Sequence, residues 1–292
     1  MLGYVGPPVP LAELVTRPRH SLLIQSYQPK EMTSGTVNAD GYGAALWLDD
    51  DRPEPAIYRT AAPIWADPNL GWMGDRLRVR AALAAVRSAT PGIGYELSNV
   101  QPFARGRVSL VHNGYVEKFR HGPQRAIRQG LQTAAYESIA GTSDSEHLFA
   151  LVLDQLDREV GPPSPKDLPP PLPQGALERA IRAALGRLGR ICREERVACV
   201  AALIVSDGET LLAARWSHGV PSATLYAAAF PQDVQAGTRQ PGSPDLAFCV
   251  ASEPLEPTAS PSGGGRSHWQ AIAPQRLLVL APGRPPRTEP LE

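Results

Sequence analysis

Cysteine is scarce in this chain. Its 292 residues include only three, Cys192, Cys199 and Cys249. They are dispersed, no two form a Cys-x-x-Cys pair, and each lies in largely apolar surroundings. This pattern excludes a disulfide framework and a cysteine-based zinc site, and it is typical of small buried side chains in a reducing cytosol. We therefore expect a cytoplasmic protein.

The chain also lacks net charge and long apolar runs. Its 29 Lys and Arg residues balance its 29 Asp and Glu residues, which argues against a nucleic-acid or membrane partner held by electrostatics. The longest apolar run, residues 197–205, is far shorter than the ~20 residues that cross a membrane. No spacing of the histidines predicts a metal site. We expect neither a metal nor another cofactor, and the oligomeric state stays open.

Proline is abundant, with 31 residues. Three Pro-rich stretches, 161–175, 231–244 and 257–267, have no apolar period and are typical of exposed connections. We expect one large domain over residues 1–281, with the connector 161–175 inside it, and a loose C-terminal tail over 282–292. The length is sufficient for a sizeable core.

Strand patterns occur toward both ends of the chain and two long amphipathic helices lie between them, which favours an α+β fold. We expect strands at 1–5, 42–48, 56–59, 83–87, 107–111, 200–205, 211–216, 224–230, 246–252 and 276–280. Shorter helices are expected from Pro10, over 21–27, from Asn69 and over 124–133. The long helices are expected from Ser143 and over 176–196. Ser143 and Glu146 predict a capping box at the start of the first long helix.

One stretch allows two interpretations. The predicted strand 107–111 leads directly into Asn113-Gly114, and Asn-Gly is a strong hairpin-turn signal. The alternative is an oxyanion hole, in which a side-chain amide and the next backbone N–H point toward a developing negative charge.

Several short motifs around this stretch occur in an order that favours the second interpretation. They are Asn38-Ala39-Asp40-Gly41-Tyr42-Gly43, Val86-Arg87-Ser88-Ala89-Thr90, Asn99 with Pro102-Phe103, His112-Asn113-Gly114, Ser143-Asp144-Ser145-Glu146 and Ala251-Ser252-Glu253-Pro254-Leu255. Each motif is weak alone. Together, and covering most of the chain, they resemble the class II glutamine amidotransferases, which are N-terminal-nucleophile hydrolases.

The resemblance implies a fold and a set of roles. The fold is a four-layer αββα sandwich of two antiparallel sheets flanked by helices. Asn113 and Gly114 match the oxyanion donors, Arg87 matches the residue that grips the substrate α-carboxylate, and Asp144 matches the acceptor of the α-ammonium group. The partner is then a small-molecule γ-glutamyl substrate.

The opening Leu2-Gly3-Tyr4 and the run Ala84 to Gly92 look most like one branch of this family. That branch acts in ergothioneine biosynthesis and releases glutamate from γ-glutamyl-hercynylcysteine sulfoxide. The alternative is a generic class II glutaminase subunit. No side chain is clearly marked to recognise the hercynyl end; Arg215 and Trp216 are weak candidates. Asp40, Gly41 and Gly43 are expected to shape a loop, and Ser252 and Glu253 to pack or position rather than contact substrate.

The resemblance fails at the nucleophile. Family members use an N-terminal cysteine whose own amine is the base, with an opening close to Met-Cys-Arg-x-Leu-Gly-Tyr, whereas this sequence opens Met1-Leu2-Gly3-Tyr4. We expect that the native protein starts a few residues upstream. The alternative is a catalytically dead relative that binds γ-glutamyl compounds. In either case, the chain as written is expected to bind but not to hydrolyse.

Overall fold

The computed structural model describes residues 1–32, 35–88, 94, 96–162, 168–230, 246–255 and 269–291. Two of the Pro-rich stretches expected as exposed connections, 231–244 and 257–267, lie outside the described residues, as do residues 163–167 of the connector.

Seven antiparallel strands form the first sheet, in the order β11-β9-β10-β1-β4-β2-β3. The start of β1 is paired on both sides, because Leu2 lies opposite Ala251 of β10 and Ala84 of β4. The strand bounds are Leu2–Pro10 (β1), Tyr42–Leu48 (β2), Ala56–Thr60 (β3), Arg78–Val86 (β4), Tyr226–Phe230 (β9), Ala247–Ala251 (β10) and Gln270–Ala271 (β11).

Six antiparallel strands form the second sheet, in the order β13-β12-β8-β7-β6-β5. Strand β5 is short and covers only the first three residues of β6, because Phe103 to Arg105 lie opposite Leu110 to Val108. The strand bounds are Phe103–Arg105 (β5), Val108–Val116 (β6), Cys199–Ser206 (β7), Leu211–His218 (β8), Arg276–Leu280 (β12) and Arg287–Pro290 (β13).

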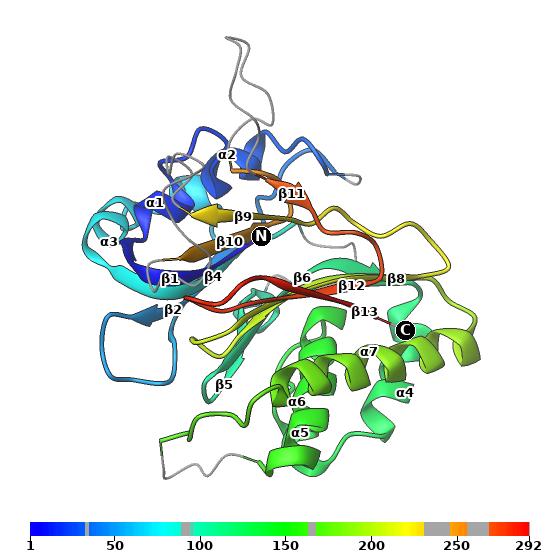
Figure 1. Cartoon of the computed structure of the whole chain (residues 1–292). Helices are drawn as coiled ribbons and strands as arrows, with labels where there is room; N and C mark the ends of the chain where they lie inside the picture. Colours follow the sequence, from blue (N-terminus) through cyan, green and yellow to red (C-terminus); the bar gives the residue numbers. More distant parts are fainter. Residues whose placement is uncertain are drawn as a thin grey trace.

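Helices cover the outer face of each sheet (Figure 1). The six-stranded sheet carries α4 (Pro123–Gln129), α5 (Thr133–Glu137), α6 (Asp144–Val160) and α7 (Ala176–Glu195), and the seven-stranded sheet carries α1 (Ala12–Val15), α2 (Leu22–Tyr27) and α3 (Leu70–Arg76). One apolar cluster lies under each helical layer and a third lies between the sheets. The expected αββα sandwich is therefore confirmed.

The described residues also include three short 3-10 helices: Ile64–Ala66 (η1), Leu97–Asn99 (η2) and Phe119–His121 (η3). The expected helix over 124–133 is two helices, because α4 ends at Gln129 and α5 begins at Thr133. Gly130 stands at the C-cap of α4, a position that glycine commonly occupies.

Two further expectations were wrong. Strand β1 continues past Gly6-Pro7-Pro8 to Pro10 through a register shift between Val5 and Val9. Prolines are tolerated at such an irregularity because no ladder N–H is needed there. The expected loose tail over 282–292 includes β13, which pairs with β12 from Arg276 to Val279. Leu291 then buries its side chain among the residues beneath α7, so the segment is tied to the sheet by β13 and to the core by Leu291.

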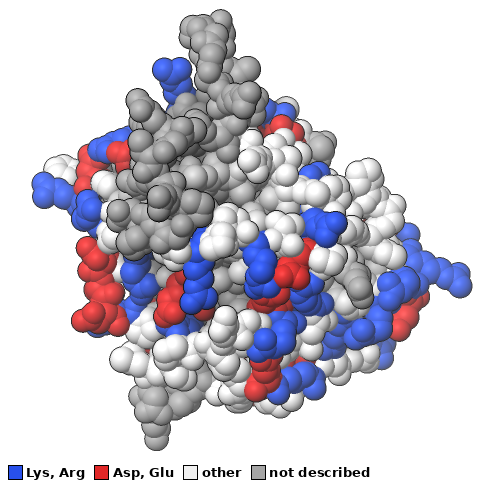
Figure 2. All heavy atoms as spheres, viewed as in Figure 1, with Lys and Arg blue, Asp and Glu red and all other residues white. Residues whose placement is uncertain are grey.

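Charged side chains of both signs are interspersed on the face shown in Figure 2, in keeping with the zero formal net charge. Within the described part of the chain, no helix combines the length and the apolarity that membrane crossing requires.

Candidate active site

Strand β6 presents an open backbone edge next to helix α6. It pairs with β7 along its whole length, but β5 ends before His112. Two side chains take the place of a neighbouring strand: Gln101 Oε1 accepts the N–H of His112 at 2.5 Å, and Asp144 Oδ2 accepts the N–H of Val116 at 2.9 Å. Because alternate residues of a strand face the same edge, the N–H of Gly114 points out between these two contacts.

The hairpin turn, one of the two interpretations of Asn113-Gly114, does not form, since both residues continue the strand opposite Ala202 and Ala201. Long-range pairing here overrides the local turn signal. Val111 packs between the sheets, whereas Leu110 and Val116 pack under the helices. By the same alternation the exposed side chain of Asn113 faces the seven-stranded sheet.

Gly114 is required by close backbone approach. A β-carbon at this position would lie 1.9 Å from the carbonyl oxygen of Val200, and φ is +153°. Only glycine therefore allows β6 and β7 to stay paired here. The result is an exposed N–H, next to an exposed amide side chain, on a strand that is fixed along its other edge.

Helix α6 begins where the sequence predicts. The Ser143 hydroxyl accepts the N–H of Glu146 at 3.2 Å. The Glu146 carboxylate does not close a reciprocal box, because it accepts the N–H groups of Ala140 and Gly141 instead. Burial raises the pKa of Glu146, although these two hydrogen bonds oppose the shift. Asp144 is the first residue of the helix, where the macrodipole favours a negative charge.

Two buried histidines connect β6, α6 and the helices that follow. His112 Nε2 contacts the Val200 carbonyl at 3.1 Å and its Nδ1 contacts the Ser145 hydroxyl at 2.9 Å. His147 Nδ1 donates to the Ser143 carbonyl at 2.7 Å, so its Nε2 is free to accept from Arg128 Nε at 2.8 Å. Burial lowers the pKa of both imidazoles, that of His147 to about 4. Both are therefore neutral at pH 7.

A short relay connects Arg87, at the end of β4, to the start of α6. Arg87 Nη2 donates to the Gly94 carbonyl at 3.0 Å, and Asn99 Nδ2 donates to the same carbonyl at 3.3 Å. The buried Asn99 Oδ1 accepts the N–H groups of Thr142 and Ser143 at 2.8 and 3.1 Å. These hydrogen bonds connect Arg87 to Thr142 and Ser143, which directly precede Asp144.

The start of β1 pairs with β4, the strand that ends next to Arg87. The Met1 amine donates to the Ser252 hydroxyl at 2.9 Å. Burial lowers the pKa of this amine to about 6, and the negative charge of Glu253 opposes the shift. Glu253 contacts His20 Nε2 at 2.7 Å and the Lys30 N–H at 2.8 Å. Burial would raise the pKa of Glu253, but these hydrogen bonds more than offset it and the pKa is lowered. Ser252 and Glu253 therefore both make internal contacts.

Sequence reasoning missed one part of the site, Gln101, and named Arg215 and Trp216 only as weak candidates for the hercynyl end. Gln101 completes the edge of β6, and only its place before the Pro102-Phe103 motif could have drawn attention to it. Arg215 donates to the carbonyls of Ala223 and Ile272, and Trp216 is buried against α7. Two of the three Arg215 nitrogens and the Trp216 ring are thus engaged in internal contacts.

The described residues contain no cluster of three or more His, Cys, Asp or Glu side chains able to hold a metal ion. All three cysteines are buried free thiols. Burial raises the pKa of Cys249 to about 12, and a hydrogen bond with Cys192, together with burial, raises that of Cys199. The same hydrogen bond lowers the pKa of Cys192.

Part of this chain is similar to curated proteins of known name. The chain is 41% identical over 117 residues to the γ-glutamyl-hercynylcysteine sulfoxide hydrolase of Mycolicibacterium smegmatis, a match covering 40% of this chain and 51% of that protein. It is 40% identical over 117 residues to the enzyme of the same name from Mycobacterium tuberculosis, covering 40% and 49%. The matched region thus spans about half the length of these relatives.

A solved structure, a class II glutamine aminotransferase domain protein from Silicibacter pomeroyi, superposes with a TM-score of 0.61 at 22% identity, over 99% of this chain and 98% of that one. This likeness shows the fold. The sequence profile of the class II glutamine amidotransferases matches residues 20–290, and the chain therefore belongs to that family.

Proposed function

We propose that this protein is an amidohydrolase that cleaves the γ-glutamyl amide of γ-glutamyl-hercynylcysteine sulfoxide and releases glutamate, in the cytoplasm, as a step of ergothioneine biosynthesis. Two relatives that carry this activity in their names support the substrate. The observation that carries the proposal is the relay from Arg87 through Gly94 and Asn99 to the start of α6, beside the open edge of β6.

Each group has a chemical role in this proposal. The Arg87 guanidinium pairs with the substrate α-carboxylate, for which its planar donors are suited. Asp144 accepts hydrogen bonds from the α-ammonium group while it keeps the Val116 N–H. The Asn113 amide and the Gly114 N–H hold the oxygen of the γ-carbonyl as it becomes negative. Two such donors typically contribute several kcal/mol to lowering the barrier.

The nucleophile is proposed to be a cysteine just upstream of Met1, in the family's Met-Cys-Arg-x-Leu-Gly-Tyr arrangement. Its thiolate attacks the γ-carbonyl, the amine half of the substrate leaves with a proton, and water hydrolyses the resulting thioester. The buried, free Cys192, Cys199 and Cys249 have no α-amine to act as base. Residues 1–292 alone should therefore bind γ-glutamyl compounds without hydrolysing them.

The start of β1 can accept such an extension. Ser252 Oγ needs one donor from position 1, and a peptide N–H supplies it as well as an amine does. A peptide group also avoids the cost of burying an ionisable amine, whose pKa is lowered to about 6. The extended chain should therefore be at least as stable as residues 1–292 near pH 7.

The test compares two purified proteins, residues 1–292 and the same chain preceded by Met-Cys-Arg with the initiator Met removed. Mass spectrometry follows glutamate release from γ-glutamyl-hercynylcysteine sulfoxide. We expect hydrolysis only by the extended protein, and Asn113→Ala in that background should lower kcat by roughly 10²–10³. An Ala in place of the added Cys is the matched control.

Two outcomes would count against the proposal. Hydrolysis by residues 1–292 alone would show that another group is the nucleophile. A folded extended protein that neither binds nor hydrolyses the substrate would refute the assignment itself. Glutamine, tested in parallel, separates this function from a generic class II glutaminase, which would prefer glutamine.

A further inference from the structure

Glu146 departs from the capping role that its place in the sequence predicts. In a capping box, the acidic residue of the first turn accepts the N–H of the N-cap residue. Here Asn99 accepts the N–H of Ser143 instead, at 3.1 Å. The Glu146 carboxylate reaches the preceding segment, where its two oxygens accept the N–H groups of Ala140 and Gly141 at 2.9 and 2.6 Å. Both oxygens of a buried carboxylate therefore bind the backbone that leads into α6.

Glu146 and Asn99 meet around Gly141. A β-carbon on Gly141 would lie 2.6 Å from Asn99 Oδ1 and 2.9 Å from Glu146 Oε2. Because Asn99 also accepts the next N–H along the chain, the four consecutive N–H groups of residues 140–143 donate to just two buried side chains. Losing such an acceptor leaves a backbone donor unpaired, which is costly. The backbone directly before Asp144 is therefore held at each of its N–H groups.

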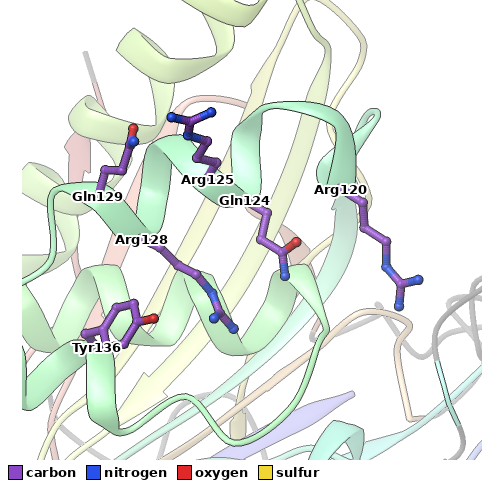
Figure 3. Close-up of a pocket in the computed structure, with 6 residues that line it drawn as sticks. All are labelled: Arg120, Gln124, Arg125, Arg128, Gln129 and Tyr136. Carbon is purple, nitrogen blue, oxygen red and sulfur yellow. The ribbon is translucent and has the colours of Figure 1, made fainter.

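Arg128 braces the two ends of this segment. Its Nε donates to His147 Nε2 at 2.8 Å, just after the segment, and its guanidinium carbon lies 5.7 Å from the centre of the Tyr136 ring, just before it. Figure 3 shows the Arg128 side chain of α4 beside that ring. Burial raises the pKa of Glu146, and the positive charges of Arg59 and Arg128 oppose this shift. These charges therefore favour the ionised carboxylate, which can accept both N–H groups.

Asp144 depends on this segment for its position. Its Oδ2 accepts the Val116 N–H at 2.9 Å and its Oδ1 accepts the Ser145 N–H at 2.7 Å. Its backbone follows residues 140–143 directly, so a movement of that segment is passed to Asp144. A displacement of about 1 Å is enough to remove much of what a binding group contributes.

We propose that Glu146 is a positioning residue for the ammonium end of the substrate: by binding the N–H groups of Ala140 and Gly141, it holds Asp144 where Asp144 meets the α-ammonium group. This inference rests on the proposed function. Glu146 acts through Asp144 and not on the ligand itself. Its loss therefore weakens the binding of ligands that carry an α-ammonium group and leaves the binding of ligands without that group unchanged.

The test uses calorimetric titration of residues 1–292 with two ligands, γ-glutamylmethylamide and glutaric acid monomethylamide, which is the same molecule without the α-ammonium group. The parent protein should bind γ-glutamylmethylamide about tenfold or more tightly than the second ligand. In Glu146→Gln the amide oxygen accepts one N–H, but the amide NH₂ is set against the other. We expect the ratio of the two affinities to fall below about threefold, with glutaric acid monomethylamide binding unchanged.

The ratio of the two affinities separates positioning from stability. Partial unfolding weakens the binding of both ligands by the same factor and leaves their ratio unchanged. Asp207→Asn is the matched control, because Asp207 is also a buried acid that accepts two N–H groups, those of Glu209 and Thr210, in the turn after β7. This variant should lower the urea midpoint, as Glu146→Gln does, and keep the ratio.

The outcomes separate this inference from the proposed function. If residues 1–292 bind neither ligand, or bind both equally, the proposed roles of the site fail. If the parent protein shows the preference and Glu146→Gln keeps it, or if Asp207→Asn loses it too, the inference alone fails. Should Glu146→Gln not fold, Gly141→Ala takes its place, because a β-carbon there meets both acceptor oxygens and leaves the Glu146 charge present. An unchanged ratio in that variant would likewise overturn the inference.

Discussion

Strands β1 and β6 both lead to the candidate site, but they contribute to it in different ways. The first residues of β1 are buried and paired on both sides, with β10 and β4. Residues 112–116 of β6 are paired on one side only, with β7. A strand paired on both sides has no backbone donor left to offer. The open edge of β6 must satisfy its N–H groups with side chains or a ligand, which makes it the natural place for an oxyanion donor.

The two strands also differ in how much space surrounds their glycines, Gly3 of β1 and Gly114 of β6. A β-carbon on Gly3 of β1 would meet side-chain carbons of Ile204 and Leu211 at 2.7 and 2.9 Å, which can shift. A β-carbon on Gly114 would meet the Val200 carbonyl oxygen at 1.9 Å, with φ at +153°. We expect Gly114→Ala to lower the free energy of unfolding by about 3 kcal/mol or more and Gly3→Ala by about 1–2.

Urea unfolding of both variants checks this order. Gly186→Ala is the control, because a β-carbon there meets nothing within 4 Å and the change should stabilise helix α7 by about 0.5–1 kcal/mol. Equal losses for Gly3→Ala and Gly114→Ala would mean that β6 is no more constrained than β1.

The pH dependence of the free energy of unfolding tests the contribution of His147, the buried histidine of α6. Burial lowers the pKa of His147 to about 4, so between about pH 6.5 and 4 the unfolded chain binds a proton that the folded chain does not. Stability is complete above pH 6.5 and falls as the pH drops through this window, by roughly 2–3 kcal/mol. His147→Asn should lower stability at pH 7.5 and flatten the decline.

Urea midpoints at pH 7.5, 6.5, 5.5 and 4.5 give the slope. The exposed His121 of η3 offers the matched control, since His121→Asn should leave the slope of the parent protein unchanged. An unchanged slope in His147→Asn would assign the pH dependence to other buried groups, of which His112 is the first to test.

Asp144 is expected to serve β6 and the ligand through different properties. As an acceptor it satisfies the Val116 N–H, and as a charge it is proposed to hold the substrate ammonium group. Asp144→Asn keeps an acceptor oxygen, so it should cost under about 1 kcal/mol of stability but weaken γ-glutamylmethylamide binding tenfold or more. Asp144→Ala should cost about 1–3 kcal/mol in addition to the binding loss. Paired urea and calorimetric measurements separate the two, and normal binding by Asp144→Asn would exclude the ammonium role.

Periodicity and capping are local, so they predicted the α+β class and the start of α6, whereas the four layers were implied by the resemblance to the amidotransferases. The bounds of β2 and β12 match the expected strands, and Ser143 caps α6 as its motif predicts. A turn at Asn113-Gly114 stayed a possible interpretation because nothing local reveals that Val200 of β7 lies against Gly114. The tail was misjudged for the same reason: β13 is recognisable only through its pairing with β12.

The site was predictable where a residue acts through its own chemistry and not where it acts through a neighbour. Arg87 and Asp144 belong to ordered motifs, and hydrogen bonds through Gly94 and Asn99 connect Arg87 to Thr142 and Ser143, next to Asp144. The roles of Asn99 and Gln101 depend on which N–H groups lie opposite their amides, at separations of 44 and 11 residues in the sequence. No periodicity encodes such pairings. Amide side chains near a motif therefore carry positional information that appears only in the folded structure.

Substitutions of Gln101 have the smallest expected effect on the free energy of unfolding. They test directly whether side chains are needed to hold the open edge of β6. Its amide accepts the His112 N–H at 2.5 Å and donates to the His112 carbonyl at 2.9 Å, as a neighbouring strand would. Gln101→Ala should cost about 1–2 kcal/mol, because both groups are only partly buried and water can replace one contact. Gln101→Glu keeps the acceptor but sets a carboxylate against the His112 carbonyl, so it should be no more stable than Ala. If both variants unfold like the parent protein, water alone satisfies this edge, and the open N–H of Gly114 needs no side-chain neighbours to hold it in place.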